Sequence, residues 1–113
     1  MLVLNRFVVP DGAEDGFAER GHAALAALAA SPGYLSGRLT RALDDPAHWA
    51  LVTEWESVGA YRRSLGRFDV KVHATPFLSQ SRDEPSAFET LASAAPGAEV
   101  AVVASDRAAE PWR

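Results

Sequence analysis

The sequence contains no cysteine among its 113 residues. Disulfide bonds, cysteine-ligated zinc, iron–sulfur clusters and thiol nucleophiles are therefore excluded. The sequence also has no run of basic residues, and its 11 Lys and Arg against 15 Asp and Glu give a formal net charge of −4. Nucleic acid is therefore not expected as a main partner.

Long apolar runs and familiar catalytic motifs are missing as well. The N-terminal run from Met1 to Leu4 is far too short for a signal sequence or a membrane span. We therefore expect a cytoplasmic protein with no membrane partner. There is no Ser-His-Asp motif, Gly-rich phosphate loop or HExxH pattern, and the histidines lack metal-ligand spacing, so no metal site is expected.

The composition that remains is that of one small globular domain with a thin core. Apolar residues make up 48% of the chain, but 22 of them are alanines, which bury little area. A sheet with one apolar face left open would then be stabilised by a second copy of the chain. The composition therefore favours a homodimer.

The hydrophobic pattern alternates between the periods of strands and helices. Strands are predicted over 2–9, 34–43, 48–55 and 86–91, and helices over 13–30, 58–65 and 67–74. In the second strand, we expect Leu35, Leu39 and Leu43 to share one face. The last helix should stop at Thr75-Pro76, because the residue before a proline avoids the helical region, and residues 77–85 should form a polar loop.

This order of elements predicts an α+β, ferredoxin-like βαββαβ fold. Its antiparallel sheet would carry the helices on one face, and two such sheets packed face to face would form a dimeric α+β barrel. The domain is expected to span residues 1–91. Residues 92–113 are interpreted either as a tail or, through a strand at 98–104, as an extra strand that contacts the partner subunit.

Two polar residues stand out as candidate catalytic groups. Asn5 lies in mid-strand between Val3 and Phe7, where a buried amide must find a hydrogen-bond partner in the protein or in a ligand. His73 has apolar neighbours and would serve as a general base or an axial haem ligand, although a lone histidine is more often structural. Both interpretations stay open for each residue.

Aromatic side chains are numerous enough to line a pocket for a flat ligand. The alternative is that they form the core and the dimer interface, which is the commoner role of any single aromatic residue. The candidates are Phe7, Phe17, Trp49, Trp55, Tyr61 and Phe68.

From Leu2 to about Leu91, the sequence resembles the antibiotic biosynthesis monooxygenase (ABM) domain family. The landmarks are Val9-Pro10, the Ser31–Tyr34 turn, and the segment Val52–Ser57 with an aromatic residue, Tyr61, four positions after its serine. The resemblance implies the dimeric barrel described above. It also implies an oxidoreductase, although members of this family carry out different chemistry.

One branch of the family, the small haem-degrading monooxygenases, is similar in part. Asn5 matches an asparagine near the distal oxygen, and His73 matches the axial iron ligand. The tryptophan that ruffles haem is replaced by Ser64, and a bulky aromatic of the first helix is replaced by Gly21. The resemblance implies that both replacements enlarge the pocket, which argues against haem ruffling but leaves haem as an alternative cofactor.

A second branch oxidises aromatic polyketides to quinones with O2 and no cofactor, and this is the function we expect. The resemblance then assigns substrate contact to Asn5, proton transfer to His73, and pocket walls to further residues. Those wall residues are Phe7, Trp55, Tyr61, Ser64 and Phe68. A third interpretation is a non-catalytic dimeric module that binds a small molecule or nothing.

Overall fold

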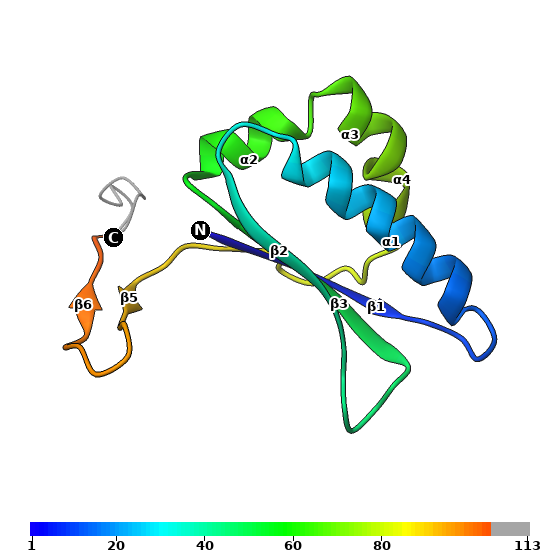
Figure 1. The fold of residues 1–113 in the computed structure, drawn as a ribbon, viewed down its shortest axis with the longest axis horizontal. Coiled ribbons are helices and arrows are strands. Elements are labelled where there is room, and N and C mark those ends of the chain that lie inside the picture. The colour runs from blue at the N-terminus through cyan, green and yellow to red at the C-terminus, as the bar shows by residue number, and fades with distance from the viewer. Residues whose placement is uncertain (105–113) are drawn as a thin grey trace, which may run out of the picture.

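The computed structural model describes residues 1–104. Four helices and a four-stranded sheet form the body of the molecule, and two short strands follow it (Figure 1). The elements in chain order are β1 (Leu2–Val8), α1 (Glu14–Ala29), β2 (Tyr34–Arg41), β3 (His48–Trp55), α2 (Val58–Ser64), α3 (Phe68–His73), α4 (Thr75–Leu78), β4 (Ala87–Phe88), β5 (Ala92–Ser93) and β6 (Ala101–Val102).

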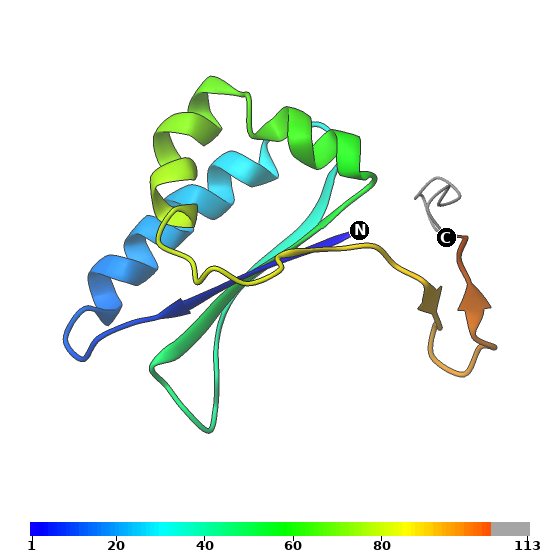
Figure 2. The ribbon, with the colours of Figure 1, turned by 180° about the vertical axis from the view of Figure 1, so that it is seen from behind.

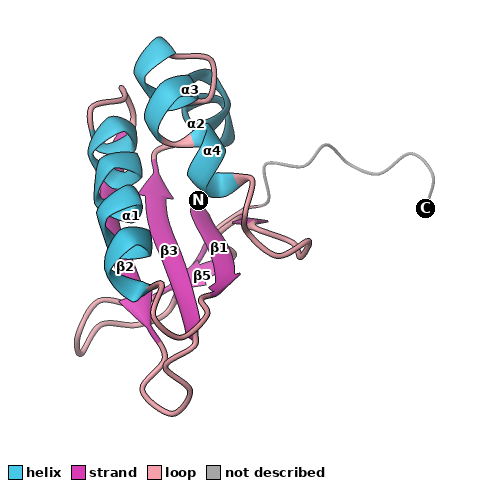
Figure 3. Ribbon diagram, turned by 90° about the vertical axis from the view of Figure 1, so that its right-hand side faces the viewer, coloured by secondary structure: helices cyan, strands magenta, loops and turns pink. Residues whose placement is uncertain are grey.

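The main sheet is antiparallel with the strand order β2-β3-β1-β4. β1 lies at its centre, where Leu2 pairs with Glu54 on one side and with Phe88 on the other. All four helices lie against one face of this sheet, and the opposite face is left open within the chain (Figures 1 and 3). The predicted α+β, ferredoxin-like fold is therefore confirmed.

The core forms between the sheet and the helices because β1 alternates with a period of two. Val3, Asn5 and Phe7 point toward the helices and are buried. Leu2 and Val8 point to the open face and are exposed. Alanines on α1 let that helix approach the sheet closely, and Leu28 is its largest fully buried side chain.

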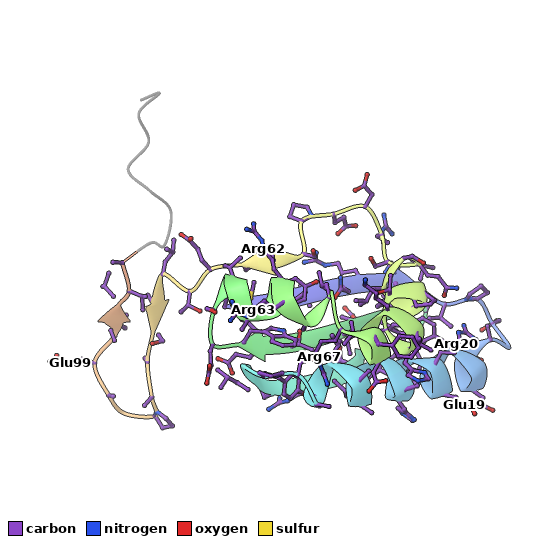
Figure 4. The ribbon with its side chains drawn as sticks, turned by 90° about the horizontal axis from the view of Figure 1, so that it is seen from above. Glu19, Arg20, Arg62, Arg63, Arg67 and Glu99 are labelled. Carbon is purple, nitrogen blue, oxygen red and sulfur yellow. The ribbon has the colours of Figure 1, made fainter. Side chains whose placement is uncertain are left out.

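Side-chain hydrogen bonds fix the helices around this core. The Ser57 hydroxyl accepts a hydrogen bond from the Ala60 N–H at 3.0 Å and caps the start of α2. The Arg67 guanidinium, just before α3, donates to the Ser31 hydroxyl at 2.8 Å and to the Ala27 carbonyl at 3.4 Å (Figure 4). Arg67 thus ties α3 to the end of α1, where carbonyl groups lack helical partners.

The expected face of the second strand is wrong. The pairing of β2 with β3 shifts between Tyr34 and Ser36, and this bulge turns Leu35 to solvent. Leu39 does face the helices with Leu51 as its strand partner. The strand ends at Arg41, so Leu43 lies in the following turn and is fully exposed.

The helix end expected before Thr75-Pro76 is confirmed, because α3 ends at His73, but the loop expected from residue 77 is wrong. Thr75–Leu78 forms α4, in which the Leu78 N–H donates to the Ala74 carbonyl. Pro76 occupies the first turn of α4, where its missing N–H leaves no helical bond unmade. The predicted polar loop therefore starts later, and the strand predicted over 86–91 is shorter, because only Ala87 and Phe88 pair with β1.

The C-terminal part of the described chain forms a separate hairpin. β5 pairs only with β6, with Ala92 opposite Val102 and Ser93 opposite Ala101. Figures 1 and 2 show this hairpin beyond the N-terminal end of β1, away from the helices. Of the predicted strand at 98–104, only Ala101–Val102 is strand, and residues 105–113 lie outside the described part. Across residues 1–104, each helix falls short of the length and apolar content that a membrane span requires.

Candidate active site

Asn5 lies at the middle of the helix-facing side of the sheet. Its strand partner is Leu51, which is completely buried, and its neighbours on the same side of β1 are Val3 and Phe7. The Asn5 side chain is only 9% exposed. The period of β1 therefore places a primary amide on the buried side of the strand, between two apolar residues.

Asn5 differs from the other buried polar residues in having no internal partner. The Ser31 and Ser64 hydroxyls donate to the Ala27 and Tyr61 carbonyls, and the Thr53 hydroxyl accepts from the indole N–H of Trp55 at 2.8 Å. In contrast, the Asn5 amide makes no hydrogen bond to any residue that the structure describes.

The Asn5 amide is nevertheless open to a small extent. Every fully enclosed side-chain nitrogen or oxygen within residues 1–104 has a hydrogen-bond partner, so the atoms of the Asn5 amide must keep some access to solvent. Water can therefore satisfy these atoms in the free protein, and a ligand that reaches them can take the place of that water. Such a group is suited to bind a ligand that supplies the missing hydrogen bonds.

Aromatic residues lie on both sides of Asn5 along the sheet. Toward Phe7, the rings of Phe17 and Phe77 are 5.1 and 4.7 Å from the Phe7 ring, measured between centroids. Toward Val3, the Trp55 ring lies 5.5 Å from Tyr61 and 5.4 Å from Tyr34.

Phe7 and Trp55 are almost completely buried in these two clusters. They therefore bound the region around Asn5 as fixed walls rather than as exposed ligand contacts. Their predicted role in substrate binding stays a prediction.

Tyr61 adds a second polar group with no internal partner. Its hydroxyl makes no hydrogen bond to the described residues, and burial raises the pKa of this phenol above its usual value of 10. The side chain is therefore neutral at physiological pH. It would act toward a ligand as a hydrogen-bond donor, and it is too weakly acidic to supply a phenolate base.

The expected enlargement of the pocket is wrong at Gly21. A side-chain carbon at this position would lie 2.9 Å from Leu39 and 3.2 Å from Phe77, so those two residues already fill the space beside the glycine. Ser64 is also buried, and its hydroxyl donates to the Tyr61 carbonyl at 2.6 Å. Sequence reasoning missed Phe77, because it was assigned to a loop, where no packing position could be given to it.

His73 and Phe68 lie apart from this region. Both belong to α3, whose buried residue is Val70, and both are exposed to solvent; Phe68 is 78% exposed. Within the described chain, His73 makes no hydrogen bond or ion pair. The structure does not bring His73 next to Asn5, so the paired role of these two residues stays a prediction.

The residues that would hold haem do not fit that group. An axial ligand must point into an enclosed pocket, whereas His73 is exposed to solvent. Leu39 and Phe77 occupy the space beside Gly21. The Ser64 hydroxyl already donates its hydrogen bond to the Tyr61 carbonyl within α2. Among residues 1–104, no three His, Asp or Glu side chains converge as metal ligands would.

The sheet order and the single layer of helices define a ferredoxin-like α+β domain. The family model described as "Antibiotic biosynthesis monooxygenase" (ABM) matches residues 1–74. The chain belongs to this family. No match was found among curated proteins.

Solved structures with the same fold include an oxygenase of known type. SnoaB from Streptomyces nogalater, described as a cofactor-independent oxygenase, is 29% identical, with a TM-score of 0.63 over 80% of this chain and 94% of that one. A point mutant of SnoaB aligns over 95% of this chain and 93% of that one, with 22% identity and a TM-score of 0.63. A conserved protein from Methanosarcina mazei is 16% identical, with a TM-score of 0.63 and coverage of 76% and 84%.

Proposed function

We propose that this protein is a cofactor-independent monooxygenase that oxidises a bulky aromatic metabolite, of the polyketide or quinol type, with O2. Membership of the ABM family and the likeness to SnoaB support the general class. The observation that carries the proposal is the Asn5 amide, which lies between two aromatic clusters and has no partner in the described chain. A planar ligand with an oxygen atom would fill that need.

The chemistry requires little from the protein. Loss of a proton from an anthrone or a quinol gives an electron-rich enolate or phenolate, and a hydrogen bond from the Asn5 amide to its oxygen stabilises that charge. The resulting carbanion passes one electron to O2, and the two radicals combine to a peroxide. For a CH2 group, loss of water from the peroxide leaves a C=O group, so CH2 and O2 become C=O and H2O and the substrate supplies all the electrons.

Proton removal is assigned to His73 in this proposal. A neutral imidazole is a suitable base near pH 7. Because His73 is exposed on α3, it would receive the proton at the mouth of the site or through water. Its replacement should therefore slow turnover rather than abolish it.

A homodimer is the second part of the proposal. The open face of the sheet carries apolar side chains that a single copy leaves uncovered, including Leu2, Val8 and Phe88. Leu2, Leu4, Arg6, Val52 and Phe88 line a groove of about 400 Å³ on this face. A second copy with the same surface would cover it by an isologous contact.

The test is oxygen uptake by the purified protein with anthrone and quinol substrates. We expect O2-dependent quinone formation without added cofactor, and a loss of about 100-fold in kcat for Asn5→Leu, the usual effect of removing one oxyanion donor. The matched control is Ser79→Ala, which removes an exposed hydroxyl just after the end of α4 and should leave the rate unchanged.

Two outcomes would contradict the proposal. Full activity in Asn5→Leu would remove Asn5 from the site. No oxygen uptake with any aromatic substrate, together with ligand binding that depends on Asn5, would identify a non-catalytic binding module. A haem titration serves as a parallel check: a saturable Soret shift that is lost in His73→Ala would favour the haem alternative.

A further inference from the structure

The charge of the chain is distributed unevenly along its sequence. Residues 62–73 hold four of the 11 Lys and Arg but only one of the 15 Asp and Glu, which gives this segment a net charge of +3. The rest of the chain carries −7, because the total is −4. The segment covers the end of α2 and all of α3, in the helix layer that Figure 4 shows with Arg62, Arg63 and Arg67 labelled. A basic surface on an acidic protein is suited to attract an acidic partner.

The four basic side chains of this segment have no carboxylate partner in the part of the chain that the structure describes. Arg67 is half-buried, and its Nη1 group donates to the Ser31 hydroxyl and the Ala27 carbonyl, which are both neutral. Its Nε and Nη2 groups donate to no described residue. The Arg67 guanidinium is therefore held in place with its charge unneutralised, and a carboxylate could bind it with little further ordering of the side chain.

An exposed apolar pair follows this arginine directly. Phe68 and Val72 lie one turn apart on α3, and they are 78% and 45% exposed. The side of α3 that packs into the molecule is formed by Val70 instead. An exposed aromatic ring beside a fixed guanidinium is typical of the centre of a protein–protein contact, where aromatic residues and arginine are enriched.

The acidic residues near these side chains limit the surface. Asp69 follows Phe68 by about 100° around the helix, on the side away from Lys71, and makes no ion pair in the described chain. Glu89 lines a groove of about 520 Å³ together with Arg62, so we leave Arg62 out of the surface. The α3 face is defined here as Arg63, Arg67, Phe68, Lys71 and Val72, with Asp69 at its edge.

We propose that the α3 face binds an acidic segment of a second protein, in which carboxylates flank an apolar side chain. The apolar side chain would pack on Phe68 and Val72, and one carboxylate would accept hydrogen bonds from Arg67. Further carboxylates would lie near Arg63 and Lys71. This inference goes beyond the proposed function, and the contact does not depend on oxygenase activity.

The charge of the remaining surface favours a short acidic segment over an extended polyanion. α1 packs against α3 and carries three acidic residues against one basic residue, namely Glu14, Asp15, Glu19 and Arg20. A nucleic acid or an anionic bilayer would extend past the α3 face and be repelled by the acidic remainder of the chain. A short segment contacts the α3 face alone, because exposed charges more than about 10 Å away are largely screened at 0.1 M salt.

Fluorescence anisotropy with labelled synthetic peptides tests this contact on the full chain. The acidic peptide is a helix of about 18 residues with a leucine stripe flanked by glutamates, and the matched peptide carries glutamine in place of each glutamate. We expect the acidic peptide to bind with a Kd below about 100 µM at low salt, about tenfold or more tightly than the glutamine peptide. Added salt should weaken the binding of the acidic peptide.

Two variants and one control locate the contact on the protein. Phe68→Ala should raise the Kd of the acidic peptide about tenfold, and Lys71→Gln about threefold, because a central ring contributes more than an exposed charge. The control Arg41→Gln removes an exposed positive charge from β2, an edge strand of the sheet, and should change the Kd by less than about twofold. Circular dichroism checks that all three variants fold.

The outcomes that would overturn the proposal are distinct. They are equal binding of the two peptides, no binding of the acidic peptide up to about 1 mM, and equal losses in Lys71→Gln and Arg41→Gln. Binding to vesicles of phosphatidylcholine and phosphatidylglycerol without binding to the acidic peptide would also overturn it, in favour of a lipid surface.

A spin-labelled form of the acidic peptide maps the site directly. We expect the label to broaden the amide NMR signals of residues 63–73 and to leave those of β2 sharp. Broadening centred on another part of the chain would overturn the assignment to the α3 face.

Discussion

The two sides of β1 show how one strand serves two purposes. Toward the helices, Val3 and Phe7 are each 1% exposed, whereas Leu2 and Val8 on the other side are 40% and 52% exposed. The residue types are similar, and only the neighbouring layer differs. The side that the helices cover, called the closed side, therefore provides stability and holds Asn5. The exposed side, called the open side, is left to contact the proposed second copy of the chain.

The largest expected effect tests the closed side. Phe7→Ala should lower the free energy of unfolding by about 3–5 kcal/mol, because it removes a buried ring that contacts two other aromatic rings. Val8→Ala, one residue further along, should change it by less than about 1 kcal/mol. Urea unfolding measures both at a protein concentration at which sedimentation shows the monomer, so that burial of Val8 in the proposed homodimer does not contribute. Equal effects would show that the open side is as well packed as the core.

The second prediction compares two polar residues within the closed side. Thr53→Val removes the acceptor of the Trp55 indole N–H and should cost about 1–3 kcal/mol, because that donor is left buried without a partner. Asn5→Leu removes an amide that has no partner in the described chain, so stability should stay constant or rise by about 1 kcal/mol. Thermal unfolding decides the sign. A large loss in Asn5→Leu would mean that the amide is structural.

The smallest expected effect is a pH dependence. Burial raises the pKa of the Tyr61 phenol in the folded chain. Below the unfolded value of about 10, the phenol is neutral in both states and stability is unaffected. As the pH rises above 10, the unfolded state ionises first, so the melting temperature should fall.

A matched pair of variants isolates this effect. Tyr61→Phe should reduce the fall in melting temperature that begins above about pH 10. Tyr34→Phe should reduce it less, because Tyr34 also has a raised pKa but desolvation acts there on a more exposed ring. An identical alkaline fall in the parent and in Tyr61→Phe would contradict the assignment.

Much of the fold was predictable because it depends on local patterns. The alternation of β1 and the match of β3 to His48–Trp55 follow from the period of two. The errors come from features that the period cannot show. The bulge at Leu35 depends on the pairing of β2 with β3. The second error concerns Pro76, which lies in the first turn of a new helix, α4, instead of beginning a loop after α3.

The site was less predictable than the fold. Asn5 could be singled out as a polar residue in an apolar strand, but its missing partner becomes visible only when every neighbouring element is in place. His73 and Phe68 were chosen by their position in the sequence, and the rotation of α3 leaves both exposed. Phe77 was missed because its segment was expected to be a loop. In the structure this segment forms α4, and the short helix places Phe77 in the core.

The pairing of β1 with β3 also has a consequence for the order of folding. Val8 pairs with His48 and Leu2 with Glu54, so the central ladder closes a loop of about 40 residues or more. In contrast, β2 and β3 are neighbours in the chain and pair across a short turn. During synthesis, β1 must wait until β3 has left the ribosome, and the β2–β3 hairpin should form first as the template on which the N-terminal strand assembles.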